Sequence, residues 1–192
     1  MATHSSTVMN LPNQITLARL ILSLVLFVLI PMGQYWAGLV AFIVAAGTDW
    51  LDGYIARKYN LVTKLGRILD PFVDKFLICG VFIYLAVEPA SGIAAWMAVV
   101  VVARELLVTV IRSFFEGEGI DFSAKLAGKL KMVFQCLAAA MSLAALAMAT
   151  DSPSWLSPVL IGSVWLAVGS TIYSGAGYVL RAIDLVRTEQ SG

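Results

Sequence analysis

Apolar residues form six long runs along this chain, separated by short segments rich in turn-forming residues. The first run reads "LILSLVLFVLI" and ends at Pro31-Met32-Gly33. Each run is near the roughly 20 residues that a helix needs to cross a bilayer. The pattern predicts six spans, at 13–31, 36–58, 65–87, 91–115, 125–149 and 155–184. We therefore expect an all-α, polytopic membrane protein folded as a single domain over residues 1–192.

The composition supports a membrane protein and excludes several other classes. The 192 residues are 60% hydrophobic and only 13% charged, whereas soluble domains are about half apolar and a quarter charged. His4 is the single histidine, which argues against a histidine-based metal or triad site. Cys79 and Cys136 lie in apolar runs, as buried small residues do, and indicate no disulfide framework. A net charge of +1 gives no sign of a nucleic-acid partner.

The N-terminus is interpreted as a retained first helix. It lacks the basic segment and the small-residue cleavage site of a signal peptide. Residues 3–13 could form a short interfacial helix before the first span.

The basic residues predict the orientation in the membrane. All 13 Lys and Arg fall near one side under this assignment, and the loops at 31–35, 88–91 and 150–154 contain none. Cytoplasmic loops are the ones enriched in Lys and Arg. We therefore expect both termini and the loops at 58–65 and 116–124 in the cytoplasm.

Four aspartates lie in or beside the second and third spans, within "GTDWLDGYIARKYNLVTKLGRILDPFVDKF" at 47–76. On an ideal helix, one set shares an arc of about 100°: Asp49, Asp52, Gly53 and Ala56. A second set shares an arc of about 80° on the next helix: Gly66, Asp70 and Asp74. A short loop makes the two helices antiparallel neighbours, so both acidic faces can meet in the cytoplasmic third of the membrane.

Converging carboxylates in a low dielectric need a counter-charge. Lys75 points away from the Asp70 face, and Arg57 alone is too little. An all-oxygen site favours Mg²⁺ or Mn²⁺, which keep positions open for substrate phosphates. Structural ion pairing and an ion or proton pathway are the alternatives. A pathway needs polar groups that continue to the outer face, and residues 31–45 and 76–100 offer almost none.

The spacing D-x2-D-G-x2-A-R-x8-G-x3-D-x3-D, from Asp49 to Asp74, resembles the signature of the CDP-alcohol phosphotransferases. These membrane enzymes join a CDP-linked group to an alcohol and release CMP. The resemblance implies a six-helix fold, usually homodimeric, with a site open to the cytoplasm. It implies that Asp49, Asp52 and Asp70 bind metal, and that Asp74 completes a two-metal site and acts as the base. It also implies a set of contacts to CDP: Gly53, Ala56, Arg57, Thr63 and Gly66.

Three further segments resemble bacterial members that use CDP-diacylglycerol and glycerol 3-phosphate: "NLPNQITLARL" at 10–20, "ARELLVTVIR" at 103–112 and "AGKLKMVFQ" at 127–135. This implies a bacterial inner-membrane enzyme. A cluster of basic residues suits an acceptor that carries its own phosphate. The candidates for that phosphate are Arg112, Lys129, Lys131 and, as an outside candidate, Arg19.

Alternatives remain for these cations and for the acceptor. Any one cation could be a positive-inside or snorkelling residue, and Arg104 and Glu105 could be a structural ion pair. Inositol phosphate, serine and phosphatidylglycerol are the other acceptors that fit the shared chemistry.

Overall fold

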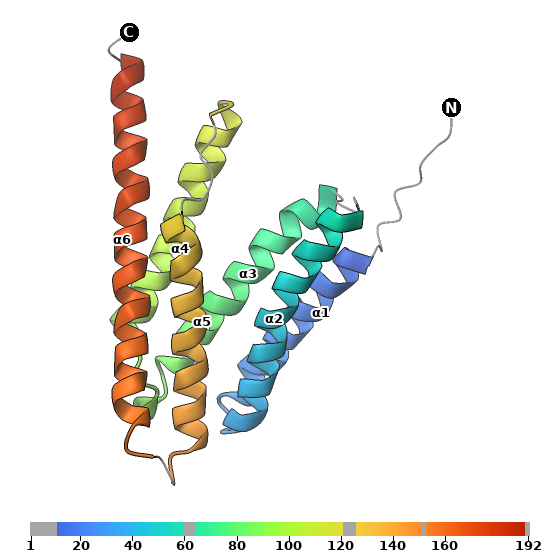
Figure 1. Ribbon diagram of the computed structural model, residues 1–192, viewed down its shortest axis with the longest axis vertical. Helices are drawn as coiled ribbons and strands as arrows, with labels where there is room; N and C mark the ends of the chain where they lie inside the picture. The colour runs from blue at the N-terminus through green and yellow to red at the C-terminus, as the bar shows by residue number, and fades with distance from the viewer. Residues whose placement is uncertain (1–10, 60–63, 121–125, 151–152, 191–192) are drawn as a thin grey trace. The chain divides into compact units, whose positions relative to one another are not determined.

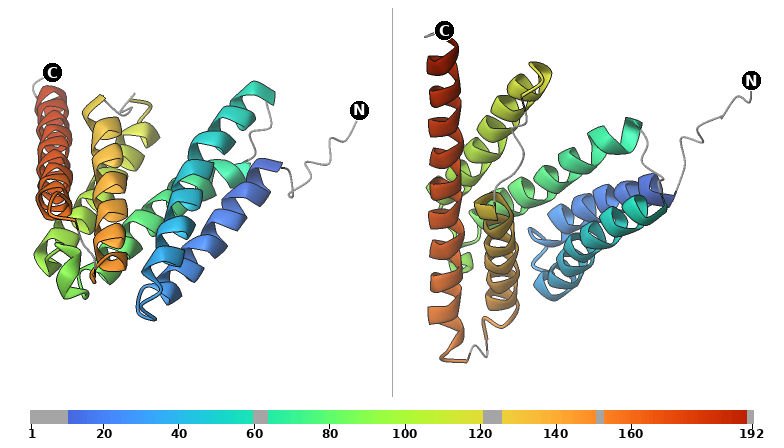
Figure 2. Two further views of the ribbon diagram at one scale, coloured as in Figure 1. Left: turned by 60° about the horizontal axis from the view of Figure 1, so that its bottom comes forward. Right: turned by 45° about the horizontal axis from the view of Figure 1, so that its top comes forward.

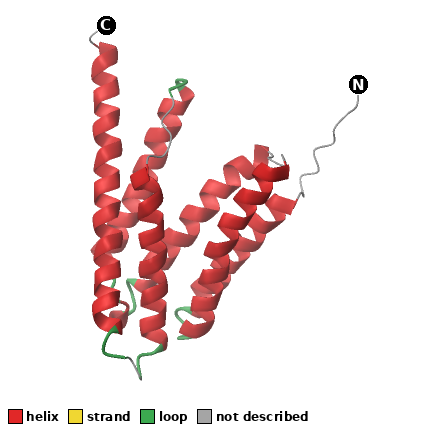
Figure 3. Ribbon diagram, in the orientation of Figure 1, coloured by secondary structure: helices red, strands yellow, loops and turns green. Residues whose placement is uncertain are grey.

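The computed structural model describes residues 11–59, 64–120, 126–150 and 153–190, with side chains except at 11–12, 49–59, 64–68, 126–127, 129 and 189–190. This part of the chain is helical and contains no strand (Figure 3). Its elements (Figure 1) are α1 (Leu11–Leu29), α2 (Tyr35–Tyr59), α3 (Lys64–Leu85), the short 3₁₀ helix η1 (Pro89–Ser91), α4 (Ala95–Gly117), α5 (Leu126–Ala147) and α6 (Leu156–Gln190). The predicted all-α class is confirmed, and each predicted span coincides with one α-helix.

The largest differences from the predicted bounds lie in the second half of the chain. The fourth helix begins at Ala95 rather than at 91 because η1 ends at Gly92, whose φ of 73° is left-handed. A residue with a side chain rarely adopts that φ, so glycine suits this turn. The last helix continues to Gln190, past the predicted end at 184. The proposed interfacial helix at 3–13 falls mostly outside the described residues.

Within the described residues, two segments are long and apolar enough to cross a membrane, Leu130–Ala147 in α5 and Leu156–Thr188 in α6. The apolar parts of α1 and α2, Asn13–Leu29 and Tyr35–Thr48, are shorter. Large apolar side chains such as Val40, Val99 and Val133 point outward. Outward-facing apolar residues on this scale are typical of a protein in contact with lipid. These features support a membrane protein, whereas six spans and the cytoplasmic termini stay predictions.

Three exposed tryptophans lie at helix starts. Trp36 and Trp96 are in the first turns of α2 and α4, and Trp155 directly precedes α6. The predicted topology puts these three helix starts at the outer face. Tryptophan is enriched at both faces where a membrane meets water, so these positions are compatible with membrane interfaces, and the orientation stays a prediction.

Contacts divide the chain into two compact units, Met1–Tyr84 and Leu85–Gly192, here called unit 1 and unit 2. In unit 1, α1 and α2 lie side by side (Figure 2). A tight turn joins them, in which Gly33 adopts a φ of 70° and its N–H bonds to the Ile30 carbonyl at 2.9 Å.

Helix α3 packs on α1 through aromatic rings. The Phe27 ring lies 5.3 Å from Phe76 and 5.2 Å from Tyr84, measured between centroids. Gly80 leaves the room for this ring, since a Cβ at Gly80 would overlap it. Pairs of contacting residues ascend in the same order along both helices, so α1 and α3 run parallel.

Unit 2 is built from η1, α4, α5 and α6, with α6 packed along both α4 and α5. Its core consists of small and branched apolar side chains, among them Val101, Ala138, Leu143 and Ala167. Small residues let helices approach closely, as is usual where lipid surrounds a bundle.

Candidate active site

The aspartate signature lies on α2 and α3. Asp49, Asp52, Gly53, Ala56 and Arg57 occupy the second half of α2, and Gly66, Asp70 and Asp74 occupy the first half of α3. The prediction that these residues lie on two consecutive helices is therefore confirmed for the backbone. Thr63 lies outside the described residues, and so do the side chains from Asp49 to Arg57 and at Gly66.

Asp70 and Asp74 are one helical turn apart and lie on one face of α3. Both are partly exposed. The Thr16 hydroxyl donates a hydrogen bond of 2.6 Å to Oδ1 of Asp70. Thr16 itself is 1% exposed, so a buried donor on α1 holds a carboxylate on α3 that ligands can still reach.

Arg19 forms an ion pair with Asp74. Its Nη1 lies 2.9 Å from Oδ1 of Asp74, and the two side chains are 0% and 29% exposed. A buried guanidinium is costly unless an anion compensates it. Asp74 provides that compensation. Arg19, which the sequence analysis named as an outside candidate for the acceptor phosphate, thus contacts a carboxylate of the aspartate signature.

Carboxylate oxygens are hard donors that suit Mg²⁺ or Mn²⁺, so Asp70 and Asp74 fit one half of the predicted metal site. Among the described side chains, no three His, Cys, Asp or Glu residues gather closely enough to hold a cation. The side chains of Asp49 and Asp52 are outside that description. The cluster of four carboxylates therefore stays a prediction.

A second polar cluster lies inside unit 2. Nη1 of Arg104 donates to the Glu105 carboxylate at 3.2 Å and 3.3 Å, and Nζ of Lys131 donates to the same carboxylate. All three residues are buried. The ion pair that was left open as an alternative for Arg104 and Glu105 is present, and Lys131 of α5 joins it.

Helix α6 completes this cluster. Nη2 of Arg104 donates to Ser174 at 2.6 Å, and the guanidinium carbon lies 5.6 Å from the centre of the Tyr178 ring. The stem of Arg104 passes Gly175, where a Cβ would come within 3.1 Å of Cγ. The cluster therefore joins α4 and α5 to α6 through hydrogen bonds that are protected from solvent.

The other predicted phosphate-binding residues lie differently. Arg112 pairs with Glu116 at 3.0 Å, one turn further along α4, and both side chains are largely exposed. Lys129 is on α5, and its side chain is outside the described residues. The structure thus brings Lys131 into the buried cluster and leaves Arg112 in a surface pair.

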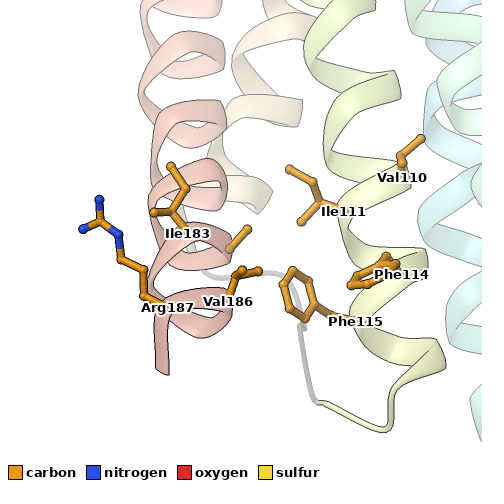
Figure 4. A pocket seen from close by; sticks show the side chains of 8 residues that line it. Val110, Ile111, Phe114, Phe115, Ile183, Val186 and Arg187 are labelled. Carbon is orange, nitrogen blue, oxygen red and sulfur yellow. The ribbon is translucent and has the colours of Figure 1, made fainter. Parts of the chain in front are cut away.

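An apolar groove between α4 and α6 is a poor phosphate site (Figure 4). Ile111 and Phe115 face Ile183 and Val186 across it. The guanidinium of Arg187, at its edge, points away from these side chains (Figure 4).

Several polar residues were missed by the sequence analysis. Thr16 was quoted within a motif but given no role, and Gln135, Thr171 and Ser174 were not singled out. Gln135 donates from Nε2 to the Thr171 hydroxyl at 2.9 Å. These residues could have been identified as polar residues within apolar runs, because a buried polar side chain usually forms a hydrogen bond with another buried group.

Comparison with known proteins places this chain in a family. A model of the CDP-alcohol phosphatidyltransferase family matches residues 9–173. The chain is 35% identical over 196 residues to the CDP-diacylglycerol–glycerol-3-phosphate 3-phosphatidyltransferase of Bacillus subtilis (strain 168), covering 93% of this chain and 98% of that protein. It is 33% identical to the protein of that name from Rickettsia bellii (88% and 93% covered) and 30% identical to the one from Pseudomonas fluorescens (94% and 94%).

The chain therefore belongs to the CDP-alcohol phosphatidyltransferase family. This confirms the resemblance carried by the aspartate signature, and with it a transferase of phospholipid biosynthesis. The matched residues extend across both compact units, and the single domain stays a prediction.

Proposed function

We propose that this protein is a phosphatidylglycerophosphate synthase. It transfers the phosphatidyl group of CDP-diacylglycerol to glycerol 3-phosphate and releases CMP. The observation that carries this proposal is the identity of 30–35% with proteins named for that activity, over nearly the full length of each chain. The aspartates on α2 and α3 supply chemistry that fits it.

In this reaction a hydroxyl oxygen of glycerol 3-phosphate attacks the phosphorus next to diacylglycerol. A new P–O bond forms, the bond to the CMP oxygen breaks, and the hydroxyl proton passes to a base. Asp74 is assigned as that base on the family resemblance, and its carboxylate, which pairs with Arg19 of α1, is partly exposed and can be reached by a substrate. Two divalent cations, Mg²⁺ or Mn²⁺, would neutralise the diphosphate and stabilise CMP as the leaving group.

Asp49, Asp52 and Asp70 are assigned as metal ligands together with Asp74. A further set of residues is assigned to the CDP moiety: Gly53, Ala56, Arg57, Thr63 and Gly66. Their place on α2, the following loop and the start of α3 puts them in the same stretch of chain as the aspartates.

Arg112, Lys129 and Lys131 are assigned to the phosphate of the acceptor. Arg104 of α4 and Lys131 of α5 both contact the carboxylate of Glu105, so two cations lie close together where an anion could pair with them. Arg19 pairs with Asp74, which favours a role beside that carboxylate over one at the acceptor phosphate.

We infer that all six α-helices span the membrane and that both termini and the active site face the cytoplasm of a bacterial cell. CDP-diacylglycerol would then enter from the inner leaflet of the inner membrane. A homodimer is proposed on the family resemblance.

The test is CMP release by purified protein with CDP-diacylglycerol and Mg²⁺, comparing glycerol 3-phosphate, inositol phosphate, serine and phosphatidylglycerol. We expect release with glycerol 3-phosphate and its loss when EDTA removes the metal. Release with a different acceptor would keep the chemistry and reassign the basic residues. No release with any acceptor would contradict the proposal and favour the ion or proton transporter.

A further inference from the structure

Helix α1 carries a stripe of buried polar residues, here called the α1 polar stripe: Asn13, Thr16, Arg19 and Ser23. They share an arc of about 120° on an ideal helix. All four are at most 7% exposed, although the rest of this helix is largely apolar. Buried polar groups on one face of an apolar helix need partners on a neighbouring element.

Two members of the stripe contact the two described carboxylates of α3 in matching order. Thr16 donates a hydrogen bond to Asp70, and Arg19 pairs with Asp74. Arg19 follows Thr16 by three residues on α1, and Asp74 follows Asp70 by four residues on α3. Each contact therefore repeats after one turn of both helices. The stripe is aligned with the face of α3 that carries the predicted metal ligands.

Packing between α1 and α3 fixes the position of one helix along the other. Beyond Arg19, the ring of Phe27 occupies the space left by Gly80, which prevents α1 from sliding along α3. Ser23 donates to the Arg19 carbonyl at 2.8 Å, within α1 itself. Ser23 therefore takes no part in the described contacts between α1 and α3.

We propose that Thr16 and Arg19 are positioning residues for the divalent-cation site, holding the carboxylates of Asp70 and Asp74 in their binding orientation. This inference rests on the cation site of the proposed function. The Thr16 hydroxyl fixes the plane of the Asp70 carboxylate, so less rotational freedom is lost when a cation binds. Partners of this kind typically change metal affinity by roughly 10- to 100-fold.

The experiment measures Mn²⁺ binding to purified full-length protein by the loss of the free-ion EPR signal. Thr16→Val keeps the shape of the side chain and removes the donor. We expect it to raise the Kd for Mn²⁺ by about tenfold, while Thr16→Ser restores it to within about twofold of the wild type. A side chain that acts only through packing would favour valine over serine, so the order of the two variants separates the roles.

Ser23→Ala is the matched control. Ser23 belongs to the same stripe and is fully buried, but its hydroxyl donates to a carbonyl within α1. We expect its Mn²⁺ affinity to equal that of the wild type. An unchanged affinity in Thr16→Val, an equal loss in Ser23→Ala, or absence of Mn²⁺ binding in the wild type would each overturn the inference.

The same preparations are assayed for CMP release, which separates the two proposals. Wild-type protein that releases CMP but shows no effect of Thr16→Val on Mn²⁺ binding keeps the proposed function and removes this inference. If the Mn²⁺ affinity depends on Thr16 but the wild type releases no CMP with any acceptor, this inference is kept and the proposed function is removed.

Discussion

The two polar clusters differ in exposure and in the side chains that form them. In unit 1, Asp70 and Asp74 are partly exposed, and one buried cation, Arg19, faces them. In unit 2, Arg104 and Lys131 are buried around one carboxylate, from Glu105. The first cluster thus presents two carboxylates that ligands can reach, and the second encloses two cations around a carboxylate.

This difference indicates a chemical role for the cluster in unit 1 and a structural role for the cluster in unit 2. A partly exposed pair of carboxylates can bind a cation or accept a proton, because ligands reach it. The enclosed cluster connects three helices, and Arg104 donates a hydrogen bond to Ser174 of α6. Its main role is therefore to stabilise the packing of unit 2. An influence of Lys131 on the acceptor would add to this structural role.

Asp74→Asn is expected to give the largest effect, since it removes the proposed base and keeps the shape. CMP release should fall by at least about 100-fold, the lower end for loss of a general base. The control is Asp184→Asn, which changes an exposed carboxylate on α6 and should leave the rate unchanged. Equal rates in the wild type and Asp74→Asn would contradict the assignment of the base.

Glu105→Gln probes the enclosed cluster, because it leaves two buried cations without their carboxylate. We expect it to lower the free energy of unfolding by about 3–5 kcal/mol, measured by titration with SDS and tryptophan fluorescence. Glu116→Gln is the matched control on the same helix, and breaks an exposed pair worth at most about 1 kcal/mol. Similar losses in both variants would show that burial does not distinguish the pairs.

Gly80→Ala tests the packing that aligns α1 with α3. The new Cβ would overlap the Phe27 ring, and overpacking of this kind costs about 1–3 kcal/mol. Gly162→Ala is the control, since that position on α6 has no atom within 4 Å of the added Cβ. Unfolding in SDS measures both variants, and a stability equal to that of Gly162→Ala would remove the proposed constraint on sliding.

The helices could be predicted because apolar runs and turn residues are local properties of the sequence. The aspartate face of α3 followed from the same reasoning, since Asp70 and Asp74 are spaced by one turn. The start of α4 was predicted too early because Pro89 begins a 3₁₀ turn that the apolar pattern does not distinguish from a helix.

Contacts between helices were much harder to predict. The bond from Thr16 to Asp70 depends on the register of α1 against α3, which the fit of Phe27 at Gly80 fixes. The pattern of residues along one helix does not determine how far that helix is shifted along its neighbour. The partners of Arg104 on α6 were missed for the same reason, although the adjacent pair with Glu105 was named as an alternative from the sequence.

The most direct test of the account is formation of the lipid product. Purified protein in vesicles that contain CDP-diacylglycerol is supplied with glycerol 3-phosphate and Mg²⁺, and lipid and CMP are quantified by mass spectrometry. The account predicts phosphatidylglycerophosphate and CMP in equal amounts, with neither formed by Asp74→Asn above its residual rate. CMP release without a lipid that contains the added glycerol phosphate would contradict it.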